Sequence, residues 1–150
     1  MRNLVVSSLR VLGAAAAVAA LIPGAAQAGA VSVTNGWIRA LPGNAPAGGY
    51  FELANGTAKA VVLTGASSSA CGMLMLHKTE ETSGMASMDD VAQIPVAAGA
   101  HLSFAPGGYH LMCMDPTAAI RPGGRVAVTL SFADGSKVTA DFAVRNATGR

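Results

Sequence analysis

Four side chains that can bind a metal ion lie within five residues in the second half of the chain. The segment GGYHLMCMDP at 107–116 contains His110, Met112, Cys113 and Met114. In a β-strand, side chains two residues apart point to the same face, so His110 and Met112 would project together, about 7 Å apart along the backbone. An imidazole and a thioether at that separation can converge on one ion. Met114 shares this face and could cover the ion, whereas Cys113 would face the opposite side.

Candidates for the other half of a site lie upstream. His77 ends the apolar run CGMLML, and Met85 and Met88 lie in the polar segment KTEETSGMASMDD at 78–90. We expect this segment to be a loop from which either methionine can swing over the site. Two imidazoles with two thioethers form a neutral, soft donor set, and thioethers bind hard or borderline ions poorly. The donor set therefore favours Cu(I) over Zn(II), Mg(II) or Ca(II).

The elements that must position these side chains are short strands. Runs such as YFELAN at 50–55 and RVAVTLSF at 125–132 are bounded by turn residues, and Asp134-Gly135 is a strong hairpin signal. Beyond residue 28, no stretch keeps an apolar pattern at helical spacing for three turns without Gly or Pro. Seven or eight strands at this spacing predict an all-β sandwich or Greek-key barrel in a single domain.

The first 28 residues have the features of a secretory signal peptide. Arg2 and Arg10 flank the charged start, VLGAAAAVAALI is an apolar core, and AQA at 26–28 is a small-x-small cleavage site. No cysteine follows that site, which argues against a lipid anchor, and the apolar stretch is too short to span a membrane stably. We therefore expect one domain over 29–150, exported and soluble in the periplasm.

Charge and residue arrangement argue against two other classes of protein. The chain has 10 basic and 8 acidic residues, so loss of Arg2 and Arg10 leaves it formally neutral. A neutral exported chain has no basic patch for nucleic acid. Nothing in the sequence orients His77 or His110 toward a thiol, as a Cys–His nucleophile would require. We expect neither nucleic-acid binding nor an enzyme.

The two cysteines, Cys71 and Cys113, leave alternatives open. An exported chain permits a disulfide between them, which would stabilise the fold by roughly 2–4 kcal/mol, but they could equally be two separately buried thiols. A blue-copper electron-transfer site would instead use Cys113 as a thiolate with two His and a Met. Two features count against that alternative. Cys113 faces the opposite side of the strand from His110, and no histidine follows it in the short Cys–His–Met loop that such sites usually use.

The spacing of four candidates resembles the signature of periplasmic copper chaperones of the PCu(A)C type. That signature is a His, ten residues, a Met, twenty-one residues, then His-x-Met, and His77, Met88, His110 and Met112 fit it without a gap. The segments GWIRALPGNAPAGGYFELAN, LSFAPGGYHLMCM and VTLSFADGSKVTADFAV also resemble segments of the family. The resemblance covers essentially residues 31–144.

The resemblance implies a cupredoxin-like β-sandwich that binds one Cu(I) through His77, Met88, His110 and Met112. It also implies delivery of that copper to an acceptor, either the copper subunit of cytochrome c oxidase with its dinuclear centre or another copper chaperone. A periplasmic copper storage or tolerance protein is the alternative. Lys78 is a departure, because family members usually have an acidic residue after the first His.

Overall fold

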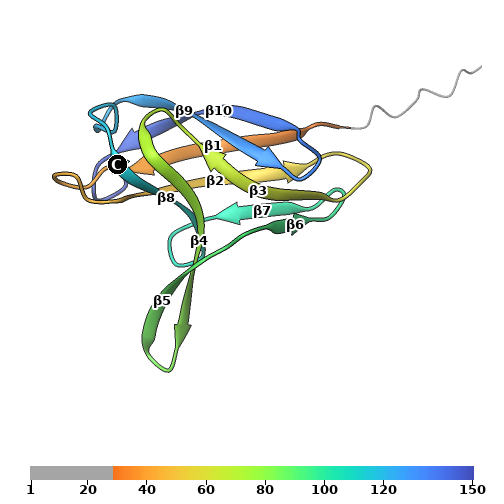
Figure 1. The fold of residues 1–150 in the computed structure, drawn as a ribbon, viewed down its shortest axis with the longest axis horizontal. Helices are drawn as coiled ribbons and strands as arrows, with labels where there is room; N and C mark the ends of the chain where they lie inside the picture. The colour runs from red at the N-terminus through yellow and green to blue at the C-terminus, as the bar shows by residue number, and fades with distance from the viewer. Residues whose placement is uncertain (1–28) are drawn as a thin grey trace, which may run out of the picture.

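The computed structural model describes residues 29–150, and within that range the protein is all-β with no helix (Figure 1). Its strands are β1 (Val31–Arg39), β2 (Ala47–Asn55), β3 (Val61–Ser67), β4 (Cys71–Thr82), β5 (Met85–Asp90), β6 (Ile94–Val96), β7 (His101–Phe104), β8 (Tyr109–Pro116), β9 (Arg125–Phe132) and β10 (Lys137–Arg145). The predicted all-β class is confirmed, with ten strands instead of seven or eight. The predicted signal peptide lies outside the described residues. From residue 29 onward, no helix has the length and hydropathy needed to cross a bilayer.

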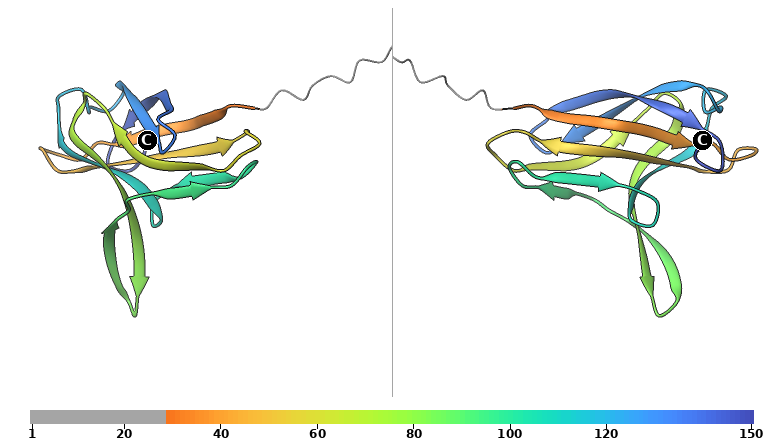
Figure 2. Two further views of the ribbon diagram at one scale, coloured as in Figure 1. Left: turned by 45° about the vertical axis from the view of Figure 1, so that its right-hand side comes forward. Right: turned by 180° about the vertical axis from the view of Figure 1, so that it is seen from behind.

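The strands form one hydrogen-bonded sheet in the order β5-β4-β8-β2-β1-β10-β9-β3-β6, with β7 also paired to β2. The sheet branches at β2, where residues 47–49 pair with β8 and residues 51–54 pair with β7. β3 also contacts β4 without pairing to it, so strands from opposite parts of the order come together. The sheet therefore folds over its own core, as the views in Figure 2 show.

The core is built from the apolar positions of the alternating strands. Phe51 and Phe104 stack with ring centroids 4.2 Å apart, and Phe142 packs against Phe51 at 5.7 Å. Each buried side chain of this size contributes about 1.5–3 kcal/mol relative to an exposed one. The Asp134-Gly135 hairpin forms as predicted between β9 and β10, with Gly135 at a φ of 84° that favours glycine. These contacts hold the central strands of the sheet in a fixed register.

One buried polar side chain, Asn55, closes a corner of the sheet at the end of β2. Asn55 is 1% exposed, and its Nδ2 donates to the carbonyl oxygens of Lys59, Val96 and Ala97 at 2.8, 3.0 and 3.1 Å. Its Oδ1 accepts from the backbone N–H and the hydroxyl of Thr57 at 3.1 and 2.7 Å. The amide thus has partners on both its nitrogen and its oxygen, as a buried polar group requires.

A disulfide joins Cys71 at the start of β4 to Cys113 in β8, with their Cα atoms 5.4 Å apart. This settles the alternative that the sequence left open. Both cysteines are buried, and the bridge spans 42 residues, for which the chain-entropy model gives about 4 kcal/mol. Because the Cys113 sulfur is bonded to Cys71 and faces the core, it does not supply a free thiolate ligand.

The segment expected to be a loop after His77 is a β-hairpin instead. β4 continues to Thr82 and pairs with β5 through a turn at Ser83-Gly84, whose φ values of 55° and 80° fit a two-residue hairpin turn. All of β5 is exposed, and the hairpin projects from the rest of the molecule (Figures 1 and 2). The expectation was wrong because neither face of the hairpin tip is buried, so no apolar alternation marks these strands.

Candidate metal centre

The register between β4 and β8 brings the two histidines together. His77 lies directly opposite His110, and Met75 lies opposite Met112. Directly paired residues of antiparallel strands share a face, with Cβ atoms about 4.5–5.5 Å apart. The intervening residue Leu111 is buried on the core face, as the strand parity predicted. Donors that are 33 residues apart in the chain therefore become neighbours on the outer face of one strand pair.

His110 is only 4% exposed and has one free ring nitrogen. Its Nδ1 lies 3.1 Å from the carbonyl oxygen of Gly108, which can only accept, so Nδ1 carries the hydrogen. In the neutral ring, Nε2 then has a lone pair, and this buried atom has no hydrogen-bond partner among the described residues. A buried acceptor without a partner is costly. The backbone bond thus fixes the tautomer and orientation that a metal-binding imidazole needs.

His77 has a different environment although its ring meets that of His110. The two ring centroids are 5.6 Å apart in an edge-to-face arrangement. The His77 Nε2 lies 2.7 Å from Asp90 Oδ1 across the β4–β5 hairpin. This contact has the distance but not the direction of a hydrogen bond, since both buried ring nitrogens of His77 lack a hydrogen-bond partner within residues 29–150. Asp90 is an acidic neighbour that the spacing argument did not reveal.

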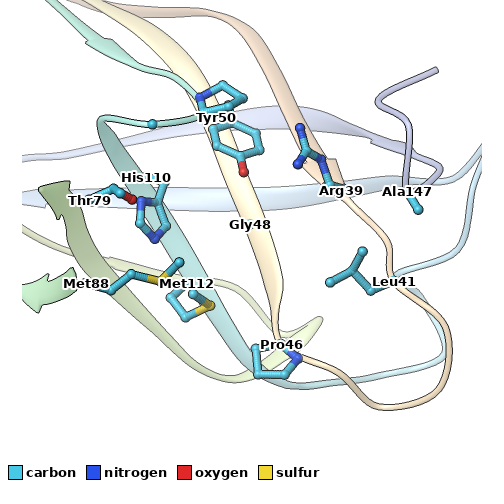
Figure 3. A pocket seen from close by; sticks show the side chains of 12 residues that line it. Arg39, Leu41, Pro46, Gly48, Tyr50, Thr79, Met88, His110, Met112 and Ala147 are labelled. Atoms are coloured by element: carbon cyan, nitrogen blue, oxygen red, sulfur yellow. The ribbon is translucent and has the colours of Figure 1, made fainter. Parts of the chain in front are cut away.

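A cavity of about 380 Å³ opens beside His110. Met112 of β8 and Met88 of β5 line it, and Figure 3 shows Met88 reaching from its strand toward Met112 and His110. Met88 is paired with Thr79 of β4, which also lines the cavity. Three of the four predicted ligands therefore line one cavity. The fourth, His77, does not line it, but its ring lies against the ring of His110. Met88 is positioned by a strand and not by a loop.

The two methionines predicted as accessory ligands lie elsewhere. Met85 begins β5 at the hairpin tip, opposite Thr82, and is 76% exposed. It is three residues from Met88 in the same strand, so it points to the opposite face. Met114 does share the face of Met112, but it lies opposite Met73 and does not line the cavity. The structure separates Met85 from the candidate ligands and places Met114 beside them.

The far wall of the cavity contains residues that the sequence did not indicate as part of a site. Arg39 of β1 and Tyr50 and Gly48 of β2 line it (Figure 3). The Arg39 guanidinium lies 5.4 Å from the ring centroids of both Trp37 and Tyr50. A Cβ atom at Gly48 would approach the Tyr50 hydroxyl to 2.6 Å, so any larger residue there would force the Tyr50 side chain to move.

Lys78, the departure from the family pattern, is directed away from the cavity. Its Nζ lies 2.6 Å from Glu80 Oε1 and 5.6 Å from the ring centroid of Tyr109. Hydrogen bonding and attraction to the Glu80 carboxylate raise the pKa of Lys78 and lower the pKa of Glu80. Both side chains remain charged at neutral pH, and the negative charge of Glu80 offsets the positive charge of Lys78. The lysine therefore adds little positive charge at the candidate ligands.

The chemistry of the centre follows from its donor types. Within residues 29–150, no group of three or more His, Cys, Asp and Glu side chains is placed to hold a metal ion. An ion bound beside His110 would therefore need the thioethers of Met88 or Met112 as donors. Thioethers with imidazole suit Cu(I) and similar soft ions. The arrangement does not suit Mg(II), Ca(II) or a structural zinc ion.

Comparisons with solved structures agree with this fold. The chain matches the copper-bound PCuAC domain from PmoF2 with a TM-score of 0.64 and 25% identity, over 79% of this chain and 95% of that domain. It matches CuI-DR1885 from Deinococcus radiodurans with a TM-score of 0.65 and 29% identity, over 80% and 81% of the two chains. These matches confirm the predicted cupredoxin-like class and the resemblance to PCu(A)C-type proteins.

Sequence comparisons identify the family. The model of the family described as "Putative lipoprotein LpqE-like" matches residues 31–144. A relative from Leifsonia xyli subsp. xyli, named "Putative lipoprotein Lxx21020", is 33% identical over 124 residues, which cover 82% of this chain and 74% of that protein. The family match spans every strand from β1 to within one residue of the end of β10. The chain belongs to the LpqE-like family.

Proposed function

We propose that this protein is an exported copper chaperone that binds one Cu(I) ion through His77, Met88, His110 and Met112. It would work in the periplasm and pass the ion to an acceptor protein. An oxidase copper subunit with a dinuclear centre is one such acceptor, and another copper chaperone is a second. In this role copper is cargo, and the protein is a carrier and not an enzyme.

The observation that carries the proposal is the free Nε2 of His110. This atom is buried, has no hydrogen-bond partner among the described residues, and belongs to a ring held by the Gly108 carbonyl. The ring lines the same cavity as Met112 and Met88. A bound Cu(I) would take up the lone pair that the fold leaves unsatisfied. Without such an ion, a nonpolar residue at position 110 would avoid the cost of burying it.

The solved relatives support copper as the ion. One is described as a copper-bound PCuAC domain and another as a Cu(I) form of DR1885, and both share the fold. The family and the Leifsonia relative carry lipoprotein names, which supports export. The disulfide between Cys71 and Cys113 also suits an oxidising compartment. It counts against the electron-transfer alternative, because it occupies the only thiolate that a blue-copper site could use in the described part of the chain.

The positions of the ligands suggest an order of release. Met88 is 60% exposed and lies on the projecting hairpin, whereas His110 is buried in the body of the sheet. An acceptor thiolate or imidazole can therefore replace Met88 first and enter the coordination of the ion from the cavity. Met112 and then the histidines would leave afterwards. Transfer by such ligand exchange keeps copper as Cu(I) throughout.

The test is an anaerobic Cu(I) competition titration of residues 29–150 against a chromophoric chelator. We expect one tight, colourless equivalent, and its loss in a Met112→Leu variant that still folds. The matched control is Met85→Leu, which removes an equally flexible thioether from the opposite face of the hairpin and should leave binding unchanged. A Met112→Leu variant that holds copper as tightly as the parent would refute the site. An intense blue band after oxidation would point to electron transfer instead.

A further inference from the structure

The outer face of β4 and β8 carries more methionine than the proposed site uses. Beyond the His77–His110 pair, Met75 lies opposite Met112 and Met73 lies opposite Met114. We call Met73, Met75, Met112 and Met114 the methionine ladder. Its two rungs lie side by side on one face, and the inner rung shares Met112 with the proposed copper site.

Core packing does not account for the ladder. The residues of β4 that fill the core are Leu74 and Leu76, which are 7% and 4% exposed, and their neighbours in β8 are Leu111 and Cys113, both at 0%. Met73 is 57% exposed, and the other three ladder methionines are partly exposed. A methionine used as a core filler would face inward. Four thioethers on the outer face of one strand pair need another explanation.

The spacing of the ladder suits a soft ion. Opposite Cβ atoms in such pairs are about 4.5–5.5 Å apart, and successive rungs are separated by about 7 Å along the strand. A methionine side chain has three rotatable bonds, so sulfur atoms from neighbouring rungs can meet at one point. Three thioethers can then surround one Cu(I), which such donors select over harder ions. No acidic or imidazole ligand is required.

We propose that Met73, Met75 and Met114 form a second, weaker Cu(I) site, from which copper moves through Met112 to His110 and His77. The proposal deepens the proposed function and rests on it. Each step is a ligand exchange in which a copper–sulfur bond to one rung breaks as a bond to the next donor forms. Copper remains Cu(I), so no oxidant or reductant takes part. The imidazole at the end of the ladder is the stronger donor and sets the direction of loading.

The experiment uses residues 29–150 with ¹³C-labelled methionine methyl groups, titrated anaerobically with Cu(I), or with Ag(I) as a redox-inert substitute. We expect the first equivalent to shift the methyl resonances of Met88 and Met112. The second equivalent should shift those of Met73, Met75 and Met114. Met85 is the internal control because it is the most exposed of these methionines, at 76% against 57% for Met73, and it should not shift at either stage.

The matched variant is a Met73→Leu, Met114→Leu double substitution, which keeps side-chain size on the outer face. It should lose the second equivalent and retain the first, with thermal unfolding unchanged within a few degrees. If the second equivalent remains, or if Met85 shifts together with Met73 and Met114, the ladder is not a site. If Met88 and Met112 fail to shift with the first equivalent, the proposed function itself fails, so the two failures are distinguishable.

Discussion

The described part of the protein has two buried polar side chains, Asn55 and His110, and they differ in how completely their hydrogen-bonding groups are satisfied. Asn55 has five hydrogen bonds at the end of β2, so both ends of its amide are satisfied. His110 has one, through Nδ1, and its Nε2 has none. Both residues are almost completely buried. The comparison shows that a satisfied buried group serves the fold, whereas an unsatisfied one with a fixed orientation is available for a ligand.

The largest expected effect is the loss of copper affinity on substitution of His110, the buried side chain with an unsatisfied nitrogen. His110→Leu should weaken Cu(I) binding at least about a thousandfold, or about 4 kcal/mol, well beyond the about 10–100-fold that loss of an outer contact costs. In the apo protein, loss of the bond to Gly108 costs about 1 kcal/mol, and removal of the unpartnered Nε2 offsets this cost, so the free energy of unfolding should change little. A chelator competition and a urea titration measure the two quantities. Large destabilisation with unchanged binding would reverse the roles assigned to the two residues.

Substitution of Asn55, whose amide is fully hydrogen-bonded, should reduce stability and leave copper affinity unchanged. Asn55→Leu removes five hydrogen bonds and leaves the carbonyls of Lys59, Val96 and Ala97 without this partner. We expect the free energy of unfolding to fall by about 3 kcal/mol, since unsatisfied buried acceptors cost about 1–3 kcal/mol each and the corner can partly rehydrate. Copper affinity of the folded variant should equal that of the parent. A tenfold loss of affinity would mean that the corner also supports the metal centre.

His77 differs from both residues, because neither of its ring nitrogens has a hydrogen-bond partner within residues 29–150 and its Nε2 lies 2.7 Å from the Asp90 carboxylate. When copper binds one ring nitrogen of His77, the other nitrogen carries a hydrogen, and the Asp90 carboxylate lies close enough to turn and accept it, which would orient the imidazole. Asp90→Asn should therefore weaken Cu(I) binding by about 10–100-fold and leave stability nearly unchanged, since Asp90 is exposed. Asp89→Asn, on the neighbouring position of the same strand, is the matched control. Equal effects of the two variants would indicate a general loss of negative charge.

The smallest effect concerns Asp134, whose carboxylate has partners but is fully exposed. The backbone N–H and hydroxyl of Ser136 donate to it, which lowers the pKa of Asp134 in the folded state. A lowered folded pKa contributes stability above the unfolded pKa of about 4, and this contribution is lost as the pH falls through the folded value. Asp134→Asn should therefore reduce the melting temperature slightly at pH 7 and not at pH 2. An equal change at both pH values would rule out this linkage.

The sequence predicted the parts of the fold that have a buried face. Alternation identified β2 and β9, and Asp134-Gly135 located the last hairpin. It did not predict the β4–β5 hairpin, since KTEETSGMASMDD has no apolar alternation and its strands depend on backbone pairing and the Ser83-Gly84 turn. Burial patterns detect strands that face a core, and this hairpin faces water on both sides.

The candidate site was predictable to the extent that parity and spacing determine it. The shared face of His110 and Met112 followed from strand geometry, and the choice of Met88 over Met85 followed from the family spacing. The contact between Asp90 and His77 could not be predicted, because it depends on the register of the β4–β5 hairpin, which only the structure shows. The disulfide could not be predicted either, because it depends on the pairing of β4 with β8, and the sequence does not show which strands pair.

The projecting hairpin also determines which insertions and deletions the copper signature can tolerate. Met88 faces the cavity because it pairs with Thr79, and between that pair and the tip lie only the outer residues of the two strands. Removing one residue from each strand near the tip would shorten the ten-residue spacing to eight and leave the Met88–Thr79 pair intact. Removing a single residue would turn Met88 to the wrong face. The face on which Met88 lies therefore requires the spacing to stay even, and does not require it to stay at ten.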